Sequence, residues 1–292
     1  MMSTKVLTRS RERSSAYYLG RTIGNVVVYA VLIIGAIAMI MPFAWMVSTS
    51  FKEAGGIFTY PPRWIPSRFV LDNYLDAWRA APFGRYFLNS IFVASAVTLG
   101  QLITCSLAAY AFARLDFPGK SLLFLLFLST IMIPLQLTII PSFLVLRELK
   151  WLDTYYALIV PFTVSAFGTF LLRQTFMTIP QELEDAAKLD GCSRLGFLWR
   201  IVLPLSKPPL ASLALFTFMG TWNDYLWPLI MTNSREMRTL QIGLRFLVSQ
   251  EGGSRWGIFM AATVMVSLPI IIFYLLVQKQ FVKGIALTGL RG

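Results

Sequence analysis

The sequence predicts an all-α integral membrane protein, and two observations carry this prediction. Of the 292 residues, 56% are hydrophobic and only 14% are charged, whereas a soluble domain usually has about 25% charged residues. Five stretches of 19 to 30 residues contain no Asp, Glu, Lys or Arg. About 20 apolar residues are enough for one helix to cross a bilayer, and a charge at the bilayer centre is costly. An ordinary soluble enzyme is therefore excluded.

The uncharged stretches set the positions of the predicted spans. They are joined by a sixth apolar region, 201–231, whose charged residues are Lys207 and Asp224. We expect six helical spans, near residues 24–47, 88–111, 121–142, 155–173, 205–227 and 257–278. The first uncharged stretch is longer than the apolar core of a secretory signal peptide. It is therefore expected to remain in the membrane as an anchor.

The charge distribution predicts the orientation. An even number of spans places both termini on one side of the membrane. On that side lie the N-terminal tail, the 112–120 loop, the 174–204 loop with the adjoining Arg173 and Lys207, and the C-terminal tail. These segments hold 15 of the 26 Lys and Arg but 6 of the 14 Asp and Glu, a net +9 of the chain's +12. Both termini are therefore predicted to be cytoplasmic, and the basicity requires no nucleic-acid partner.

The residue types present disfavour catalysis and a metal centre. The chain has no histidine, and its two cysteines are too few for a four-cysteine metal site. Gly119-Lys120-Ser121 ends like a phosphate-binding loop, but that pattern needs a glycine five residues before Gly119, where Arg114 stands. We therefore expect no cofactor or metal on this chain, and we expect Arg114 and Lys120 to hold the cytoplasmic ends of the second and third spans.

The segment 179–191 predicts a short, capped cytoplasmic helix. Pro180 suits a first helical turn, and the acids Glu182, Glu184 and Asp185 complement the positive end of the helix dipole. Ala186 and Ala187 favour helix, and their short side chains let another surface approach the helix closely. Asp190-Gly191 ends the helix. Such a helix is either an ordinary surface helix with a Glu184–Lys188 pair or one that docks in a groove on another protein.

This segment also carries a family resemblance. Glu184-Asp185-Ala186-Ala187, Asp190-Gly191 and Ile201-Val202-Leu203-Pro204-Leu205 resemble the EAA loop of binding-protein-dependent ABC importer permeases. One departure is Asp185, where the family usually has glutamate. Further stretches are similar to the sugar-importing branch that includes the second maltose permease subunit: Pro42-Phe43-Ala44-Trp45-Met46, Ser50-Phe51-Lys52, Asn73-Tyr74, Phe87-Leu88-Asn89-Ser90, Ala109-Tyr110-Ala111-Phe112-Ala113-Arg114, Trp222-Asn223-Asp224 and Gln280-Phe281-Val282-Lys283-Gly284.

The resemblance implies a fold, a cellular place and partners. The fold would be the six-helix type I ABC importer transmembrane domain, in a bacterial or archaeal plasma membrane. The expected partners are a second, homologous permease subunit, a dimer of cytoplasmic ATPase subunits and an extracytoplasmic solute-binding protein. ATP and Mg would be bound by the ATPases, so this chain would not be an enzyme. The implied organisation is a basic tail 1–22, a first span with an external segment 23–83, a core 84–278 that contains the EAA loop 179–204, and a tail 279–292.

The resemblance also implies roles for individual residues. The EAA helix would couple the permease to the ATPases through Glu184, Asp185, Ala186, Ala187, Asp190 and Gly191. The loop 232–255 is either a contact with the binding protein or a solvated connector. The last residues are either an ATPase contact or a cationic lipid anchor.

Polar residues inside the spans are candidates for the substrate pathway. We expect Gln136, Asn223 and Asp224 to line it, since an ionisable group at membrane depth is a functional hypothesis by default. The remaining polar residues are expected to form hydrogen bonds between helices: Gln101, Thr104, Ser165 and Thr217. Tryptophans near the span ends are expected to anchor in the headgroup layer, although Trp222 is also placed to stack on a sugar: Trp45, Trp64, Trp78, Trp222 and Trp227.

The predicted function is a permease subunit for a sugar, which covers an oligosaccharide, a disaccharide, a polyol or glycerol phosphate. A permease for a non-sugar solute is the first alternative, because other importers share the EAA helix. An ion-coupled secondary transporter is a weaker one, since such proteins usually carry intramembrane acids or histidines, and this chain has essentially Asp224 alone. A membrane-embedded enzyme would need a cluster of nucleophile, base or metal ligands.

Overall fold

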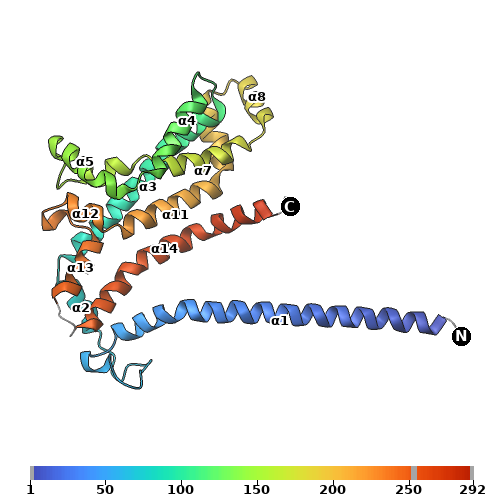
Figure 1. The fold of residues 1–292 in the computed structure, drawn as a ribbon, viewed down its shortest axis with the longest axis horizontal. Coiled ribbons are helices and arrows are strands. Elements are labelled where there is room, and N and C mark those ends of the chain that lie inside the picture. The colour runs from blue at the N-terminus through green and yellow to red at the C-terminus, as the bar shows by residue number, and fades with distance from the viewer. Residues whose placement is uncertain (1–2, 251–254, 290–292) are drawn as a thin grey trace.

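The computed structural model describes residues 3–250 and 255–289, and the described chain is built from helices (Figure 1). Short 3-10 turns (η1, η2, η3 and η5) and one π turn (η4) lie between the α-helices. The bounds in chain order are α1 Ser3–Ser50, η1 Ala54–Gly56, α2 Asp72–Arg79, α3 Phe83–Arg114, α4 Lys120–Ser129, η2 Thr130–Met132, α5 Leu135–Glu148, α6 Tyr155–Ile159, η3 Val160–Phe162, α7 Ala166–Met177, α8 Gln181–Leu189, α9 Arg194–Phe197, η4 Leu198–Val202, α10 Leu203–Leu205, α11 Lys207–Asn223, α12 Leu226–Met231, η5 Arg235–Met237, α13 Leu240–Gln250 and α14 Trp256–Gly289.

Several of these helices are long and apolar enough to cross a membrane, which confirms the all-helical membrane fold. Within the described residues, four such segments are straight enough to count alone: Gly24–Ser50, Phe83–Arg114, Tyr155–Met177 and Trp256–Lys279. Two further pairs, Lys120–Met132 with Leu135–Glu148 and Arg194–Leu205 with Lys207–Asn223, are bent by 100° and 82°. The number of spans rises to six when each bent pair counts as one crossing.

The helical span predicted for 121–142 is broken in two, because the chain turns sharply before α5. Ile133 has an extended backbone, with φ −85° and ψ 112°, and Pro134 precedes the first residue of α5. Proline has no N–H to continue the α4 hydrogen-bond ladder, and it disfavours helical geometry in the residue before it. The two halves of this region therefore meet at 100°.

The helix predicted for 205–227 also differs, because it ends at Asn223. Asp224 follows with an extended backbone, φ −69° and ψ 125°. Its carboxylate accepts a hydrogen bond from the Trp227 backbone N–H at 3.4 Å, at the start of α12. The acid thus ends one helix and supports the next, so it lies at a break in the helical backbone.

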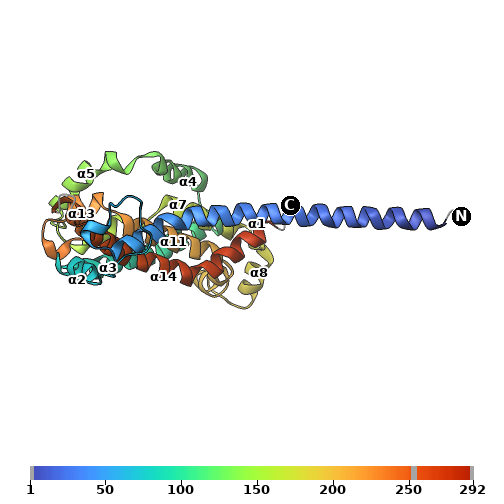
Figure 2. The ribbon, with the colours of Figure 1, turned by 90° about the horizontal axis from the view of Figure 1, so that it is seen from below.

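α3 is the central helix of the described fold. It packs against α7 and α11, and α11 in turn packs against α14. α1 contacts α14 and lies on the far side of it from the rest of the bundle, and the apolar window of α1 has no buried residues (Figures 1 and 2). Without tertiary neighbours on most of its surface, α1 is an apolar helix with free faces for lipid or another membrane helix.

The two ends of the bundle differ in what they carry. The start of α1 and the end of α14 lie on the same side of the molecule as α8, whereas α2, α12 and α13 lie at the opposite side (Figure 1). The predicted basic tail 1–22 continues into α1, which begins at Ser3, and α14 continues through the described part of the predicted tail 279–292.

Candidate functional site

The predicted cytoplasmic helix is present as α8. Pro180, with an extended backbone, precedes it, and Asp190 follows it as the C-terminal cap. Gly191 has φ +75°, a left-handed conformation that glycine adopts without steric cost. The next turn, α9, is capped at its start by Ser193, whose hydroxyl accepts a hydrogen bond from the Gly196 N–H at 3.1 Å. The local sequence therefore sets both ends of the helix.

The six residues predicted for coupling point in two directions. Glu184 and Ala187 are buried against the rest of the chain. The other four are exposed: Asp185, Ala186, Asp190 and Gly191. The sequence pattern did not separate these two sets, because the buried side of the helix includes an acid, Glu184, whose partner Arg114 comes from another helix.

Glu184 faces inward because Arg114 meets it there. The Nη1 atom of Arg114 lies 3.6 Å from Oε2 of Glu184, and both side chains are almost fully buried, at 5% and 8% exposure. On its other side, Glu184 pairs with Lys188, with Nζ 3.2 Å from Oε1. This hydrogen bond to Glu184 is the largest cause that raises the pKa of Lys188. One acid therefore links α8 to α3 and to its own last turn.

Arg114 also holds the chain that leads into α8. Its guanidinium donates hydrogen bonds to the carbonyl oxygens of Phe176, at 2.7 Å, and of Ile179, and to Oε1 of Gln181 at 3.1 Å. These acceptors lie at the end of α7, in the connection and at the first residue of α8. Because one rigid fork of donors joins all three, a movement of α8 must be transmitted to α3 or break this network.

The outward side of the loop is partly apolar. Leu183 and Leu189 of α8 are exposed at 41% and 90%, and Leu195 and Trp199 nearby are exposed at 58% and 53%. On α8 itself, Leu183 and Leu189 accompany the exposed Asp185 and Ala186, which gives a small surface with apolar groups, short side chains and a negative charge. Such a composition is typical of a docking surface rather than of a solvated loop.

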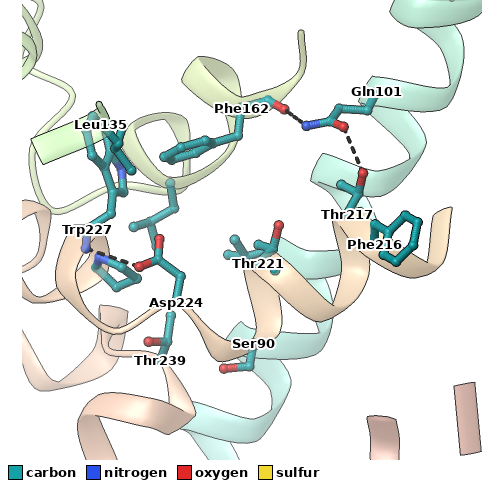
Figure 3. A pocket seen from close by; sticks show the side chains of 14 residues that line it. Ser90, Gln101, Leu135, Phe162, Phe216, Thr217, Thr221, Asp224, Trp227 and Thr239 are labelled. Atoms are coloured by element: carbon teal, nitrogen blue, oxygen red, sulfur yellow. Dashed lines mark hydrogen bonds between the residues drawn. The ribbon is translucent and has the colours of Figure 1, made fainter. Parts of the chain in front are cut away.

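A cavity of about 340 Å³ lies beside the break between α11 and α12, and it is enclosed by α3, α11, α12 and the α6–η3 segment (Figure 3). Its lining combines hydroxyl, amide and carboxylate groups with aromatic rings. The fourteen lining residues are Ser90, Val93, Gln101, Leu135, Leu158, Phe162, Phe216, Thr217, Gly220, Thr221, Asp224, Trp227, Pro228 and Thr239.

Of the three residues predicted for the pathway, Asp224 lines this cavity. The other two are exposed and are not among its lining residues. Gln136 lies on α5 one residue after Leu135, which does line it. The side chain of Asn223 donates to the Met219 carbonyl at 2.9 Å and accepts from Gln241 at 3.4 Å. The structure therefore does not bring Gln136 and Asn223 together with Asp224 at one site.

Two residues assigned to hydrogen bonds between helices also line the cavity. The Thr217 hydroxyl donates to Oε1 of Gln101 at 2.7 Å, and Nε2 of Gln101 donates to the Phe162 carbonyl at 2.8 Å (Figure 3). The helix is interrupted here, because η3 ends at Phe162 and Ser165 has an extended backbone, which leaves the Phe162 and Thr163 carbonyls for side-chain donors. The Thr104 hydroxyl likewise donates a hydrogen bond to the Thr163 carbonyl, at 2.5 Å.

The tryptophans of the α11–α12 region are core residues, so the predictions made for them are wrong. Trp222 is 1% exposed, stacks on Phe218 and donates to the Val266 carbonyl at 3.2 Å. Trp227 is 2% exposed and donates to the Ala157 carbonyl at 2.9 Å, while its ring borders the cavity. Neither residue anchors in a headgroup layer, because neighbouring helices supply its hydrogen-bond acceptor.

In the described ranges, no three side chains of the His, Cys, Asp or Glu type come together as a metal site. What the arrangement can do chemically is to bind hydroxyl groups in the cavity and to transmit movement through the Arg114 network.

Comparison with known proteins relates the chain to membrane transport systems. Residues 100–286 match the family model of the binding-protein-dependent transport system inner membrane component. The chain is 38% identical over 265 residues to the sn-glycerol-3-phosphate transport system permease protein UgpE of Yersinia enterocolitica, covering 88% of this chain and 94% of that protein. It is 36% identical over 266 residues to UgpE of Escherichia coli O157:H7, with the same coverage.

Two solved structures have a similar fold. One is a chain of a bacterial ABC transporter involved in the import of the acidic polysaccharide alginate, with a TM-score of 0.78 and 26% identity over 90% of this chain and 98% of that one. The other comes from a bacterial alginate ABC transporter in complex with an alginate pentasaccharide-bound periplasmic protein. Its TM-score is 0.58 at 15% identity, over 91% and 94% of the two chains.

Proposed function

Because this chain belongs to the family of binding-protein-dependent transport system inner membrane components, as a sugar-type permease subunit of an ABC importer in the bacterial inner membrane, we propose how it takes part in transport. It forms half of the transmembrane pathway with a second, homologous permease. An extracytoplasmic binding protein delivers the substrate to the outer side. ATP is hydrolysed by partner ATPases, and this chain contributes no catalytic residue.

We infer six crossings with both termini in the cytoplasm, counting each bent pair as one span. Two observations support this topology. The described ends of α1 and α14 lie on the same side as α8 (Figure 1). The segments of that side hold 15 of the 26 Lys and Arg, as the positive-inside rule requires of a cytoplasmic face.

We propose that α8 is the coupling helix that docks on a cytoplasmic ATPase. The single observation that carries this proposal is the division of the α8 residues between Arg114 and the surface. Glu184 is held by Arg114, so the ATPase is met by the exposed set, Asp185, Ala186 and Leu189. A rigid connection from this surface to α3 converts a displacement of the ATPase into a displacement of the cavity-lining helix.

The test is Asp185→Lys in the reconstituted complex, measured as substrate-stimulated ATP hydrolysis and as uptake. Both should fall strongly while assembly persists, because a single exposed charge is reversed without disturbing the buried pair. Glu182→Lys is a matched control, since it reverses an exposed acid on the same helix that is not among the predicted coupling residues. Full coupling in Asp185→Lys in the assembled complex would show that α8 is not the coupling contact.

We propose that a sugar or polyol passes through the α3–α11–α12 cavity. Hydroxyl and amide side chains can exchange hydrogen bonds with a polyhydroxylated substrate, and Phe162 and Trp227 supply apolar ring edges beside them (Figure 3). The Thr239 hydroxyl oxygen is buried with no hydrogen-bond partner within the described chain. A buried hydroxyl in that state is prepared for a ligand, since leaving it unpaired costs about 1–3 kcal/mol.

Glycerol phosphate is the second candidate, because the curated relatives named above are sn-glycerol-3-phosphate permeases. The fourteen lining residues include no Lys or Arg, so a phosphate group passing here would need its cation from the second permease. A ligand screen on the cognate binding protein decides between the two. Tight binding of a neutral sugar or polyol supports the first candidate, and selective binding of glycerol 3-phosphate supports the second. Binding of neither class would contradict the sugar-type substrate.

A further inference from the structure

Lys52 is a buried cation with no polar partner among the described residues, just beyond the end of the first span. It follows the Gly24–Ser50 span by two residues, and its side chain is only 3% exposed. The Nζ atom has no hydrogen-bond partner within the described chain and lies 3.9 Å from the centre of the Trp45 ring. Burial lowers the pKa of this amine. A buried ammonium in this state is costly unless an anion reaches it.

A small hollow beside Lys52 collects two further cations. Arg63 and Arg68 line it, together with Ser67 and one acid, Glu53, so the charges around it sum to +2. Neither arginine nor Lys52 forms an ion pair in the part of the chain that the structure describes. The hollow measures about 10 Å³, which is the room that a single oxygen-sized atom needs.

The backbone around the hollow is held in place by specific contacts. The Ser48 hydroxyl donates to the Trp64 carbonyl, and the Val70 N–H donates to the Phe51 carbonyl at 2.9 Å. Trp45 and Trp64 meet edge to face, with ring centres 5.0 Å apart. The three cations therefore lie on a built loop that returns to the end of the span.

The same loop carries exposed apolar side chains next to its cations. Phe58, Tyr60, Ile65 and Phe69 are exposed at 75%, 98%, 77% and 64%. Apolar residues mixed with Lys and Arg at the end of a span are typical of a segment that lies in the membrane interface. Tyrosine and tryptophan are also enriched at that depth.

We propose that Lys52, Arg63 and Arg68 bind the phosphate of an anionic phospholipid at the membrane surface. One phosphate oxygen occupies the hollow beside Lys52, and the two arginines meet the remaining charge at its mouth. The exposed apolar residues of the loop contact the acyl region beside the headgroup. A lipid satisfies both the cations and the apolar surface at once, whereas an acidic side chain of a protein satisfies the cations alone.

This site lies outside the transport pathway and the coupling helix, so its test is independent of the proposed function. The assembled importer in detergent is titrated with phosphatidylglycerol, phosphatidylethanolamine or inorganic phosphate, and bound lipid is counted by native mass spectrometry. The variants are Lys52→Gln and the pair Arg63→Gln with Arg68→Gln. Arg79→Gln is the matched control, because Arg79 is exposed on the neighbouring α2 but does not line the hollow.

The wild-type complex should retain phosphatidylglycerol in preference to phosphatidylethanolamine, and inorganic phosphate should not displace it. Each removed cation should weaken retention about fivefold, as about 1 kcal/mol per basic residue near an anionic surface predicts, while Arg79→Gln should bind as the wild type does. Equal retention of the two lipids, or unchanged retention in both variants, would overturn the proposal. Displacement by inorganic phosphate would assign a free-anion site instead. Loss of binding-protein affinity with intact lipid retention would also overturn it.

Discussion

Arg114 and Glu184 form a buried ion pair that joins the end of α3 to α8, with Nη1 and Oε2 3.6 Å apart. The pair lies beneath the exposed residues proposed to dock on the ATPase, and α3 is also the helix that carries Gln101 and Ser90 to the cavity. The two candidate sites of this permease are thus connected by one helix and one ion pair.

Arg114→Leu should uncouple or destabilise the complex, because it leaves Glu184 buried without its partner. Breaking a buried pair in this way costs about 3–5 kcal/mol. Substrate-stimulated ATP hydrolysis and the thermal midpoint of the assembled complex measure the effect. The double variant Arg114→Leu with Glu184→Leu should recover part of the lost stability, since no buried charge remains unpaired. If the stability losses of the two single variants simply add in the double variant, the two side chains do not interact as a buried pair.

Asp224→Asn should change the rate or selectivity of uptake without loss of assembly. The substitution keeps an oxygen that can accept the Trp227 N–H but removes the cavity's only charged lining group. Uptake by the reconstituted importer is the measurement, with Asn223→Ala as the comparison, because Asn223 is the adjacent residue and does not line the cavity. Equal kinetics for Asp224→Asn and the wild type would remove Asp224 from the pathway.

Gln101→Leu should lower the unfolding stability of the assembled complex more than Thr217→Val does. Gln101 connects the Thr217 hydroxyl to the Phe162 carbonyl, so its loss leaves both groups without this partner. Hydrogen bonds between membrane helices are worth about 0.6 kcal/mol on average, and up to about 1.7 kcal/mol. We expect a difference of this size in unfolding stability of the assembled complex. A larger loss of stability in Thr217→Val than in Gln101→Leu would show that Gln101 does not stabilise the contact between α3, α11 and Phe162.

Asp153→Ala should loosen the contact between the α5–α6 loop and residues 233–234, whereas Asp153→Asn should preserve it. Oδ1 of Asp153 accepts hydrogen bonds from the backbone N–H groups of Asn233 and Ser234 and from the Ser234 hydroxyl, at 2.9 to 3.0 Å. Asparagine keeps this acceptor and tolerates the positive φ of 59° at this position. Hydrogen exchange in residues 232–239 should rise in Asp153→Ala and stay near the wild-type rate in Asp153→Asn.

The same contact predicts a pH dependence. Burial alone would raise the pKa of Asp153, but the hydrogen bonds from Ser234 and Asn233 and the charge of Arg238 outweigh it and lower the pKa. The stabilisation is therefore complete above the ordinary unfolded-state value of about 3.9 and is lost as the pH falls through the folded-state pKa. Protection of the 232–239 amides, measured against the intrinsic exchange rate at each pH, should fall in that acidic range in the wild type. A pH profile identical to that of Asp153→Asn would contradict this assignment.

Gly257→Ala should destabilise the contact between α14 and the outer loop. A Cβ atom at this position would lie 2.7 Å from Nδ2 of Asn73 and 2.9 Å from the Lys52 carbonyl oxygen. Asn73 itself donates to that carbonyl at 3.0 Å, so the crowded atoms have little room to move. Overpacking of this kind costs about 1–3 kcal/mol. Gly55→Ala, where a Cβ meets no atom within 4 Å, should leave the thermal midpoint unchanged.

Local sequence signals predicted the elements that depend on a few adjacent residues. The ends of α8 follow from Pro180 and from Asp190-Gly191, because caps are set by side chains within one turn. The span regions follow from uncharged length, although the chain turns at Pro134 inside the predicted span 121–142 and α11 ends at Asn223 inside the predicted span 205–227. Prolines in membrane helices are frequently tolerated, so their presence alone did not decide where the chain would turn.

The cavity and the buried side of α8 could not be predicted with the same success. Trp222 and Trp227 have the sequence positions of interfacial anchors, but Val266 and Ala157 supply their carbonyl acceptors from distant segments. Gln136 and Asn223 have the polarity expected of a pathway residue, but the break at Pro134 and the end of α11 leave them outside the cavity lining. Polarity identifies candidates, and only their directions in space select among them.

The sequence by itself determined that this is a helical membrane protein with a basic side and a short capped helix, because hydrophobic length, charge and caps act over a single span or turn. The tertiary structure decided that Glu184 faces Arg114, that Asp224 borders a cavity and that Lys52 is buried with no polar partner in the described part of the chain. These relationships join residues that lie far apart in the chain or depend on how a loop returns to its helix. Packing decides them, because the tertiary neighbours set which side chains are buried and which polar groups they can reach.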